Sequence, residues 1–165
     1  MEDSAFEYKT RERPLARGVT EIVISLTCRD NLKVAELVYI RASSYLDFLH
    51  AHESLLELQD RFLTPFDDLL TSNSAFSNTN ASFSAIESLY VLPAFRGIKL
   101  GARLINTILS DVVVLLPASM PAPGGFPYEE DSSILNLRAY YGCLGFTHLR
   151  RAHPLIWRHF PRRAH

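Results

Sequence analysis

The stretch that most constrains the fold runs from residue 86 to residue 104, where a strand pattern changes into a helix pattern. Residues 86–92 are mostly β-branched, aromatic or large apolar side chains, as in a largely buried strand. Pro93 ends that strand because proline has no N–H for the ladder and restricts the residue before it. Gly97 and Gly101 follow as a helical pattern begins. This order directs backbone N–H groups and a helix dipole at one spot, which favours binding of an anion, phosphate above all.

A second strand is expected directly after that helix. The helix has an apolar stripe of Leu100, Leu104, Ile105, Ile108 and Leu109. Residues 112–116 then form a short, continuous apolar run, typical of a strand buried on both faces. Strand, helix and strand in this order predict a parallel βαβ unit with a right-handed crossover. Ligands of such sheets bind beyond the carboxyl ends of the strands, where the turn at residues 96–101 would lie.

The N-terminal half predicts an antiparallel hairpin followed by one long helix. Residues 1–18 are polar and are expected to form a loosely ordered arm. Residues 21–28 and 34–40 are rich in Val and Ile, and the turn residues between them favour a hairpin. Ser43 or Ser44 can cap a helix whose apolar residues then keep a helical period as far as residue 63. Residues 71–84 are rich in Ser, Asn and Thr and are expected to form a loop.

The C-terminal part predicts a loop, a helix and two short strands. Residues 117–131 contain prolines and a glycine pair, which indicates a loop. A helix should begin near residue 131 or 132 and end near Gly142 or Gly145. Residues 146–149 and 155–157 are expected to be strands, and residues 158–165 a basic tail. A chain of 165 residues then fits a single domain, residues 1–165.

Composition narrows the class of protein. Hydrophobic residues make up 47% and charged residues 21%, which is typical of a globular chain. The net charge of −1 gives no reason to expect nucleic-acid binding. No apolar run suggests a membrane span, no signal-peptide pattern begins the chain, and a cytoplasmic location is the default expectation. No Cys/His spacing suggests a metal site, and His50 and His52 would point in different directions on a helix. The sequence does not determine the oligomeric state, and a homodimer is compatible with it.

Two motifs together resemble the signatures of the GNAT (GCN5-related) N-acetyltransferase superfamily. The first resembles its acyl-CoA-binding motif and reads Tyr90-Val91-Leu92-Pro93, then Arg96-Gly97-Ile98-Lys99-Leu100-Gly101-Ala102. It departs at Lys99, where the family usually has its middle glycine. The second lies in the stretch that begins at Asn136, at the end of the expected helix, and reads Tyr140-Tyr141-Gly142-Cys143-Leu144-Gly145-Phe146. The motifs occur in the family's order, and the resemblance covers residues 85–149.

The resemblance implies a fold and a co-substrate. It implies an α+β (α/β) GNAT fold, with a mixed central β-sheet flanked by helices and an N-terminal antiparallel hairpin. It implies acetyl-CoA as co-substrate and no metal. The residues that would bind acetyl-CoA are Tyr90, Val91, Arg96, Gly97, Ile98, Lys99, Leu100, Gly101, Ala102 and Asn136. Lys99 would either add a charge contact to the CoA phosphates or crowd the turn.

The resemblance also implies catalytic residues. Tyr141 matches the tyrosine that often serves as general acid near the CoA sulfur, with aromatic core packing as the alternative. Glu87 matches a glutamate that acts as a base through water in several family members, with a solvated strand face as the alternative. Backbone N–H groups near Val91 would polarise the acetyl carbonyl. Cys143 has no activating partner nearby in sequence and is expected to pack as a small hydrophobe.

The expected function is direct transfer of an acetyl group from acetyl-CoA to an amine of an unidentified acceptor, a small molecule or a protein. A second reading is a GNAT-fold binding or regulatory protein with weakened or lost CoA turnover, because Lys99 could obstruct the phosphate turn. A third is an acyltransferase for longer chains. The loops at residues 71–84 and 117–131 are candidates to border the acceptor pocket, because loops beside a scaffolded site usually set specificity.

Overall fold

The fold was analysed in a computed structural model of the 165-residue chain. It describes residues 5–62, 81–115, 134–148 and 156–159, with the backbone alone for residues 134–138, 148 and 156–159. Within these ranges, no helix has the length and apolar character that crossing a bilayer requires.

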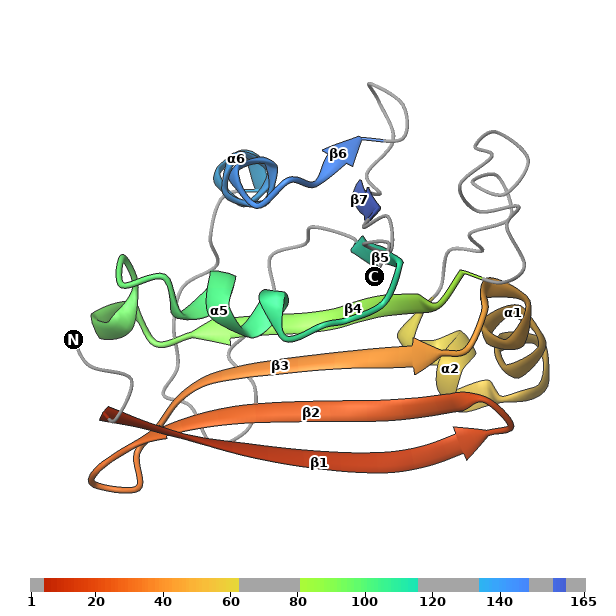
Figure 1. Ribbon diagram of the computed structural model, residues 1–165, viewed down its shortest axis with the longest axis horizontal. Helices are drawn as coiled ribbons and strands as arrows, with labels where there is room; N and C mark the ends of the chain where they lie inside the picture. The colour runs from red at the N-terminus through yellow and green to blue at the C-terminus, as the bar shows by residue number, and fades with distance from the viewer. Residues whose placement is uncertain (1–4, 63–80, 116–133, 149–155, 160–165) are drawn as a thin grey trace, which may run out of the picture.

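One mixed β-sheet carries the other elements, so the predicted α+β class is confirmed (Figure 1). Its strands lie in the order β1-β2-β3-β4-β5-β7-β6. Their bounds are β1 (Phe6–Ala16), β2 (Val19–Cys28), β3 (Lys33–Ala42), β4 (Phe83–Val91), β5 (Val112–Leu115), β6 (Thr147–His148) and β7 (Ile156–His159). In the described part of the sheet β4 and β5 pair in parallel and the other neighbours pair antiparallel.

The expected N-terminal arm is wrong, because residues 6–16 form the edge strand β1. This strand pairs with β2 from Phe6, opposite Cys28, to Ala16, opposite Val19. Most of its side chains are exposed on both faces, so its sequence lacks the apolar alternation that reveals a half-buried strand. Backbone hydrogen bonds to β2 define it instead, and Gly18, with a φ of 71°, forms the tight turn between the two strands.

The predicted hairpin is confirmed in β2 and β3. Their register runs from Val19 opposite Ala42 to Thr27 opposite Lys33. Asn31 takes a positive φ of 58° in the connecting turn, a conformation that asparagine tolerates better than most side chains.

The predicted long helix is interrupted. The structure has α1 (Tyr45–Ser54) and α2 (Leu56–Arg61), separated by Leu55 in an extended conformation. The predicted cap is confirmed, because the Ser44 hydroxyl accepts a hydrogen bond from the Asp47 amide at 3.2 Å. Phe48 on α1 and Leu58 on α2 are buried against the sheet in one cluster with Ile40 and Phe83.

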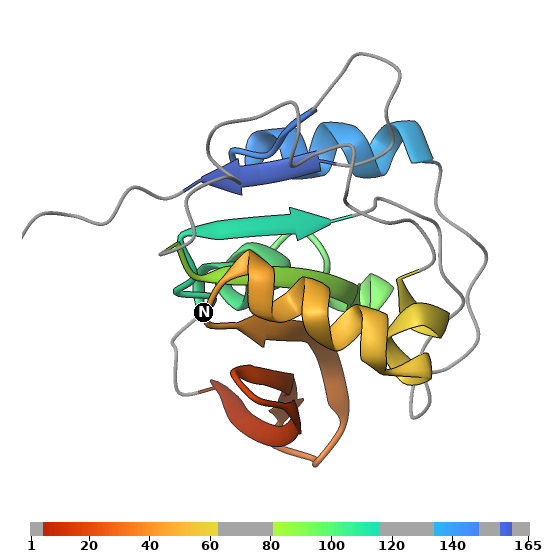
Figure 2. The same ribbon diagram turned by 90° about the vertical axis from the view of Figure 1, so that its right-hand side faces the viewer.

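The predicted parallel βαβ unit is confirmed. A 3-10 turn, η2 (Pro93–Phe95), follows β4 and precedes helix α5 (Leu100–Asn106), which leads to the fully buried β5. Leu104 of α5 and Ile86 of β4 belong to a second core cluster. Because Ala85 and Ile86 point to opposite faces of β4, α5 lies on the face of the sheet opposite to α1 and α2 (Figures 1 and 2).

The end of α5 differs from the prediction. The helix stops at Asn106, and the Thr107 hydroxyl donates to the Leu104 carbonyl at 2.6 Å. Ile108 remains buried, but Leu109 is 92% exposed. Leu109 was therefore wrongly placed on the apolar stripe, since the backbone beyond Asn106 no longer follows the helical period.

The predicted C-terminal helix and the first of the two short strands are found as α6 and β6, whereas β7 (Ile156–His159) extends beyond the predicted end at residue 157. Helix α6 (Ile134–Cys143) leads through Gly145, with a φ of 88°, to β6. Figure 2 shows α6 and β7 at the end of the molecule away from β1. The expected basic tail is wrong at its start, since residues 158 and 159 belong to β7. The loop at residues 117–131 and most of the loop at residues 71–84 lie outside the described residues, whereas residues 83 and 84 begin β4.

Candidate functional site

The turn between β4 and α5 is exposed and contains two left-handed residues. Gly97 has a φ of 87° and Lys99, at the N-cap of α5, has a φ of 63°. The side chains of residues 96–99 are exposed, whereas Leu100 behind them is buried. The turn therefore presents backbone and cationic side chains to solvent at the start of a helix, as an anion-binding turn requires.

Arg96 is directed back toward the end of β4. Its Nε donates to the Val91 carbonyl at 2.9 Å, and its guanidinium carbon lies 5.8 Å from the centre of the Tyr90 ring. These contacts fix the end of the strand relative to the turn. Arg96, Tyr90 and Val91, all predicted to bind the co-substrate, therefore lie together.

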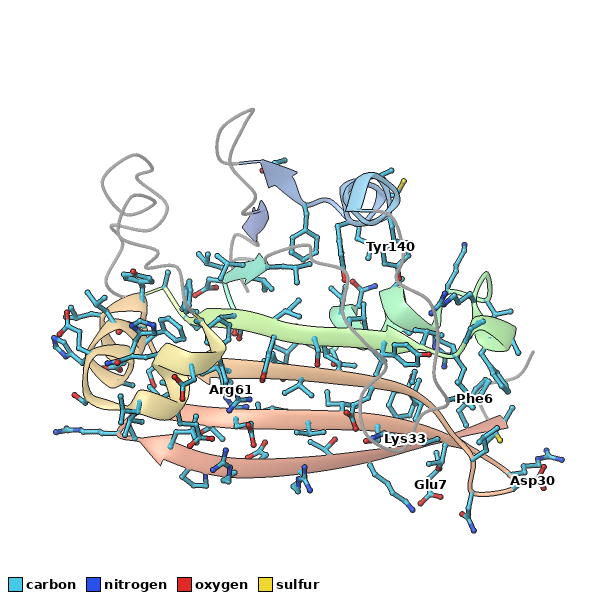
Figure 3. All side chains as sticks on the ribbon, turned by 180° about the vertical axis from the view of Figure 1, so that it is seen from behind. Phe6, Glu7, Asp30, Lys33, Arg61 and Tyr140 are labelled. Atoms are coloured by element: carbon cyan, nitrogen blue, oxygen red, sulfur yellow. The ribbon has the colours of Figure 1, made fainter. Side chains whose placement is uncertain are left out.

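Gly101 brings the two sequence motifs into contact. A Cβ atom at Gly101 would lie 2.2 Å from the Tyr140 hydroxyl oxygen and 3.5 Å from Leu89. The absence of a side chain on α5 thus makes room for the phenol of a residue on α6 (Figure 3). Tyr140 is 40% exposed, and burial of part of its ring raises the pKa of its phenol above the usual value. Tyr140 was not among the predicted catalytic or binding residues.

Tyr141 packs into the core. It is 5% exposed, and its ring makes edge contacts with Tyr140 and Phe146, with centroids 5.3 Å and 5.8 Å away. Burial, and to a smaller extent Tyr140, raises the pKa of the Tyr141 phenol far above its usual value. The phenol therefore stays protonated at neutral pH, as a proton donor must, but burial makes it a weaker acid.

Glu87 lies at a β-bulge in β4. Ile86 is opposite Tyr39 and Ser88 is opposite Val38, so Glu87 is the extra residue between them. Its carboxylate is paired with Arg61 of α2, with 2.9 Å between Arg61 Nε and Glu87 Oε2. The described pairing of β4 with β5 runs from Phe83 to Ile86 and so ends next to this bulge.

The other residues singled out from the sequence lie in α6, in the turn before α5 and in the first turn of α5. Cys143 is exposed, so its expected packing as a small hydrophobe is wrong, because it lies on the outer side of α6. Asn136 lies in α6, but its side chain is outside the described residues. Ile98, Leu100 and Ala102 lie within the turn and the first turn of α5, as predicted.

Arg61 contacts the predicted site residue Glu87 but was not itself predicted from the sequence. Arg61 is the one basic residue between Glu57 and Asp67, in an acidic segment of the sequence. A single cation among acidic residues could have indicated an ion pair. Tyr140 was missed because its neighbour Tyr141 matches the motif position. Among the described side chains, no group of three or more His, Cys, Asp or Glu residues is arranged to hold a metal ion.

Comparisons with known proteins add no identification: no family model matches the chain, and a search of curated proteins finds no match. The class that the described elements define is an α+β protein with a mixed sheet and an exposed strand–turn–helix junction.

Proposed function

We propose that this protein is an acetyl-CoA-dependent N-acetyltransferase with a GNAT fold, which transfers an acetyl group to an amine of an unidentified acceptor. One observation carries the proposal. The Tyr140 hydroxyl lies against Gly101, so two motifs that are distant in sequence meet at one place. A chance resemblance in two separate segments gives no reason for such a contact, whereas two halves of one site require proximity.

The turn at residues 96–102 is the proposed binding site for the CoA phosphates. Its exposed backbone, the left-handed Gly97 and the cations Arg96 and Lys99 suit a phosphate group. Tyr90 and Val91, at the end of β4, would border the acetyl group. The backbone N–H groups near Val91 would polarise its carbonyl.

The proposed reaction is direct attack. The acceptor nitrogen forms a bond to the carbonyl carbon, the carbon–sulfur bond breaks, the nitrogen releases its surplus proton, and the CoA thiolate takes up a proton. The products are an amide and the free thiol. Glu87 would accept the amine proton through water, and Tyr141 would donate the proton to the thiolate.

Tyr140 competes with Tyr141 for the role of acid. Tyr141 matches the family position, but its phenol is buried, and burial raises its pKa. Tyr140 is far more exposed and borders the turn through Gly101. Tyr141→Phe and Tyr140→Phe, measured separately, distinguish them: the variant of the true acid should lose about 100-fold in turnover with little change in CoA affinity.

A second candidate function is CoA binding without turnover. The burial of Tyr141 and the pairing of Glu87 with Arg61 favour it, because both predicted catalytic groups already have other contacts. The Tyr140→Phe and Tyr141→Phe variants distinguish binding alone from catalysis. A protein that only binds CoA would keep its affinity for CoA in every variant and would show no acetyl transfer in any of them.

Isothermal titration with acetyl-CoA tests the proposal first. The expected result is saturable binding that Arg96→Ala weakens, and no binding at millimolar ligand would overturn the proposal. A screen of amine acceptors that monitors thiol release follows. With the acceptor that supports turnover, Glu87→Gln should lower the rate of acetyl transfer by about 100-fold if Glu87 is the base.

A further inference from the structure

Arg61, the last residue of α2, is labelled in Figure 3. It joins two acidic side chains from different strands. Its Nη2 lies 2.5 Å from Glu21 Oε2 on β2, and its Nε lies 2.9 Å from Glu87 Oε2 on β4. The side chains of Arg61 and Glu21 are 16% and 13% exposed, and that of Glu87 is 26% exposed. Partial burial makes these contacts stronger than those of a surface pair.

Arg61 donates hydrogen bonds to only one of the two carboxylate oxygens of Glu87. Both Nε and Nη2 of Arg61 donate to the same carboxylate oxygen, Oε2. None of the hydrogen bonds within the described residues involves Glu87 Oε1. The guanidinium therefore fixes the orientation of the carboxylate and leaves one oxygen available to accept a hydrogen bond.

The guanidinium is itself held in place. Glu21 contacts it from β2, and Nη1 lies 3.3 Å from Glu57 one helical turn earlier on α2. The pKa of Arg61 is shifted up: burial alone would lower it, but hydrogen bonds and charge interactions with Glu87 and Glu21 outweigh burial. Arg61 thus remains a cation between fixed carboxylates.

Glu87 is placed where such orientation matters. As the extra residue of a bulge, it has no residue opposite it on β3. Bulges turn side chains away from the regular alternation of a strand, and the turned side chain needs another group to define its direction.

We propose that Arg61 is a positioning residue for the reaction, which holds Glu87 so that Oε1 faces the acceptor amine or the water that carries its proton. Arg61 itself touches neither substrate nor reacting atoms. This inference rests on the proposed acetyltransferase function. A role confined to fixing α2 on the sheet is the competing explanation, and the two differ in what depends on Glu87.

Arg61→Met tests the inference in the full chain, with Arg13→Met as the matched control. Arg13 also pairs with Glu21 and Glu57, with 3.1 Å from its Nε to Glu21 Oε1, but has no described contact with Glu87. Arg61→Met should lower kcat about 10- to 100-fold with the Kd for acetyl-CoA unchanged, because misplaced catalytic groups cost this much. Arg13→Met should change kcat less than about 2-fold.

A double-mutant cycle supplies the readout that a structural role would not move. In a Glu87→Gln background, Arg61→Met should have no further effect on kcat, because the group it positions is already gone. Equal losses from Arg61→Met in both backgrounds, or an equal loss from Arg13→Met, would overturn the inference and leave the proposed function standing.

Two further measurements keep the test decisive. If Arg61→Met does not fold, Arg61→Lys replaces it, since lysine keeps the charge without the fork that grips Oε2. Thermal unfolding of the same cycle needs no substrate, and additive shifts in Tm would show that Arg61 and Glu87 are not coupled, which overturns the inference. Failure of the unmodified chain to bind acetyl-CoA would overturn the proposed function, and the inference with it.

Discussion

Lys99 holds a backbone conformation that L-amino acids other than glycine seldom adopt. Its φ of 63° is in the left-handed region, where the Cβ atom crowds the backbone at a cost of about 1–2 kcal/mol. The resemblance expected glycine at this position, and the backbone takes the shape that glycine would favour. Lys99 therefore combines a backbone conformation typical of glycine with an exposed cationic side chain.

Lys99→Gly should stabilise the chain by about 0.5–1 kcal/mol, because relief of the strain exceeds the extra freedom of glycine in the unfolded state. Urea denaturation measures this change. Lys99→Ala is the matched control: it removes the same charge but keeps the strain, so its stability should stay within about 0.5 kcal/mol of the original. A loss of stability in Lys99→Gly would contradict the strained conformation. Titration of Lys99→Ala with acetyl-CoA then reports the effect of removing the lysine side chain and its charge while the strain is kept.

Gly101→Ala should destabilise the chain by about 1–3 kcal/mol, because the new methyl group would lie 2.2 Å from the Tyr140 hydroxyl oxygen. Addition of Tyr140→Phe removes that oxygen and should restore part of the loss. Urea denaturation of the two single variants and the double variant measures both changes.

Gly142→Ala is the control for that pair. Gly142 lies in α6, and a Cβ atom there would meet nothing within 4 Å. Alanine should therefore stabilise the helix by about 0.5–1 kcal/mol. Additive effects of Gly101→Ala and Tyr140→Phe would rule out the contact between the two motifs.

At the scale of elements, polar groups at one end fix the parallel pairing of β4 and β5. Asp111 Oδ2 accepts from the Ser82 amide at 2.9 Å, and the Ser82 hydroxyl accepts from the Asp111 amide at 2.8 Å. The hydroxyls of Ser84 and Ser110 lie 2.5 Å apart in the core beside them. These bonds set the register in which Phe83 lies opposite Val112. Apolar side chains alone would allow other registers.

Asp111→Ala should cost about 1–3 kcal/mol of unfolding free energy, because it leaves the partly buried Ser82 amide without its acceptor. Urea denaturation checks the value. Asp30→Ala is the control, since Asp30 is exposed in the turn between β2 and β3 and should change stability by less than about 0.5 kcal/mol. Equal losses from both substitutions would show that the β4–β5 junction has no special role.

Sequence patterns predicted strands and helices well where one face or both faces of the element are buried. β2, β3 and β5 follow from runs of Val, Ile and Leu, and α1 begins at a serine cap. β1 was missed because its exposed side chains carry no alternation, and its strand conformation depends on the backbone of β2. The break at Leu55 was also missed, since the apolar period continues across it.

At the scale of the whole molecule, paired charges link strands β1 and β2 to helix α2. Glu21 of β2 pairs with Arg13 of β1 and with Arg61 of α2. Burial would raise the pKa of Glu21, but hydrogen bonds from Arg13 and Arg61 outweigh it and hold the pKa below its usual value. A carboxylate with a lowered pKa in the folded state stabilises the fold above the unfolded pKa, and this stabilisation is lost as the pH falls through the folded pKa.

The unfolding free energy should therefore decrease as the pH falls below about 4.5, and Glu21→Gln should reduce that dependence. At pH 7 this variant should be less stable by about 1–3 kcal/mol, because hydrogen bonds to a charged group are lost. Urea denaturation between pH 7 and pH 3 measures the difference, which should shrink toward acid pH. Glu12→Gln is the control: its carboxylate is 54% exposed and 3.9 Å from Arg41, so both curves should nearly coincide.

The sequence predicts the two segments of the candidate site, but it does not predict how they contact each other in the folded chain. The sequence predicts the strand–turn–helix at residues 86–104 because its local chemistry is strong: a proline, glycines and a helical period. It also predicts α6 and the aromatic pair Tyr140 and Tyr141 within it. Which tyrosine is buried, and which lies against Gly101, depends on how α6 packs on α5, since neighbouring residues of a helix point in different directions.

The sequence by itself therefore determined the strand–turn–helix at residues 86–104, the β2–β3 hairpin and the parallel βαβ unit, because each depends on local preferences and on the period of burial. Only the tertiary structure decided that residues 6–16 extend the sheet, that Arg61 lies on Glu87 and that Tyr140 lies over Gly101. The contacts of Arg61 and of Tyr140 join residues far apart in the chain, and the strand at residues 6–16 depends on the backbone of β2. Their partners are chosen by packing and charge in the folded molecule, which no local pattern encodes.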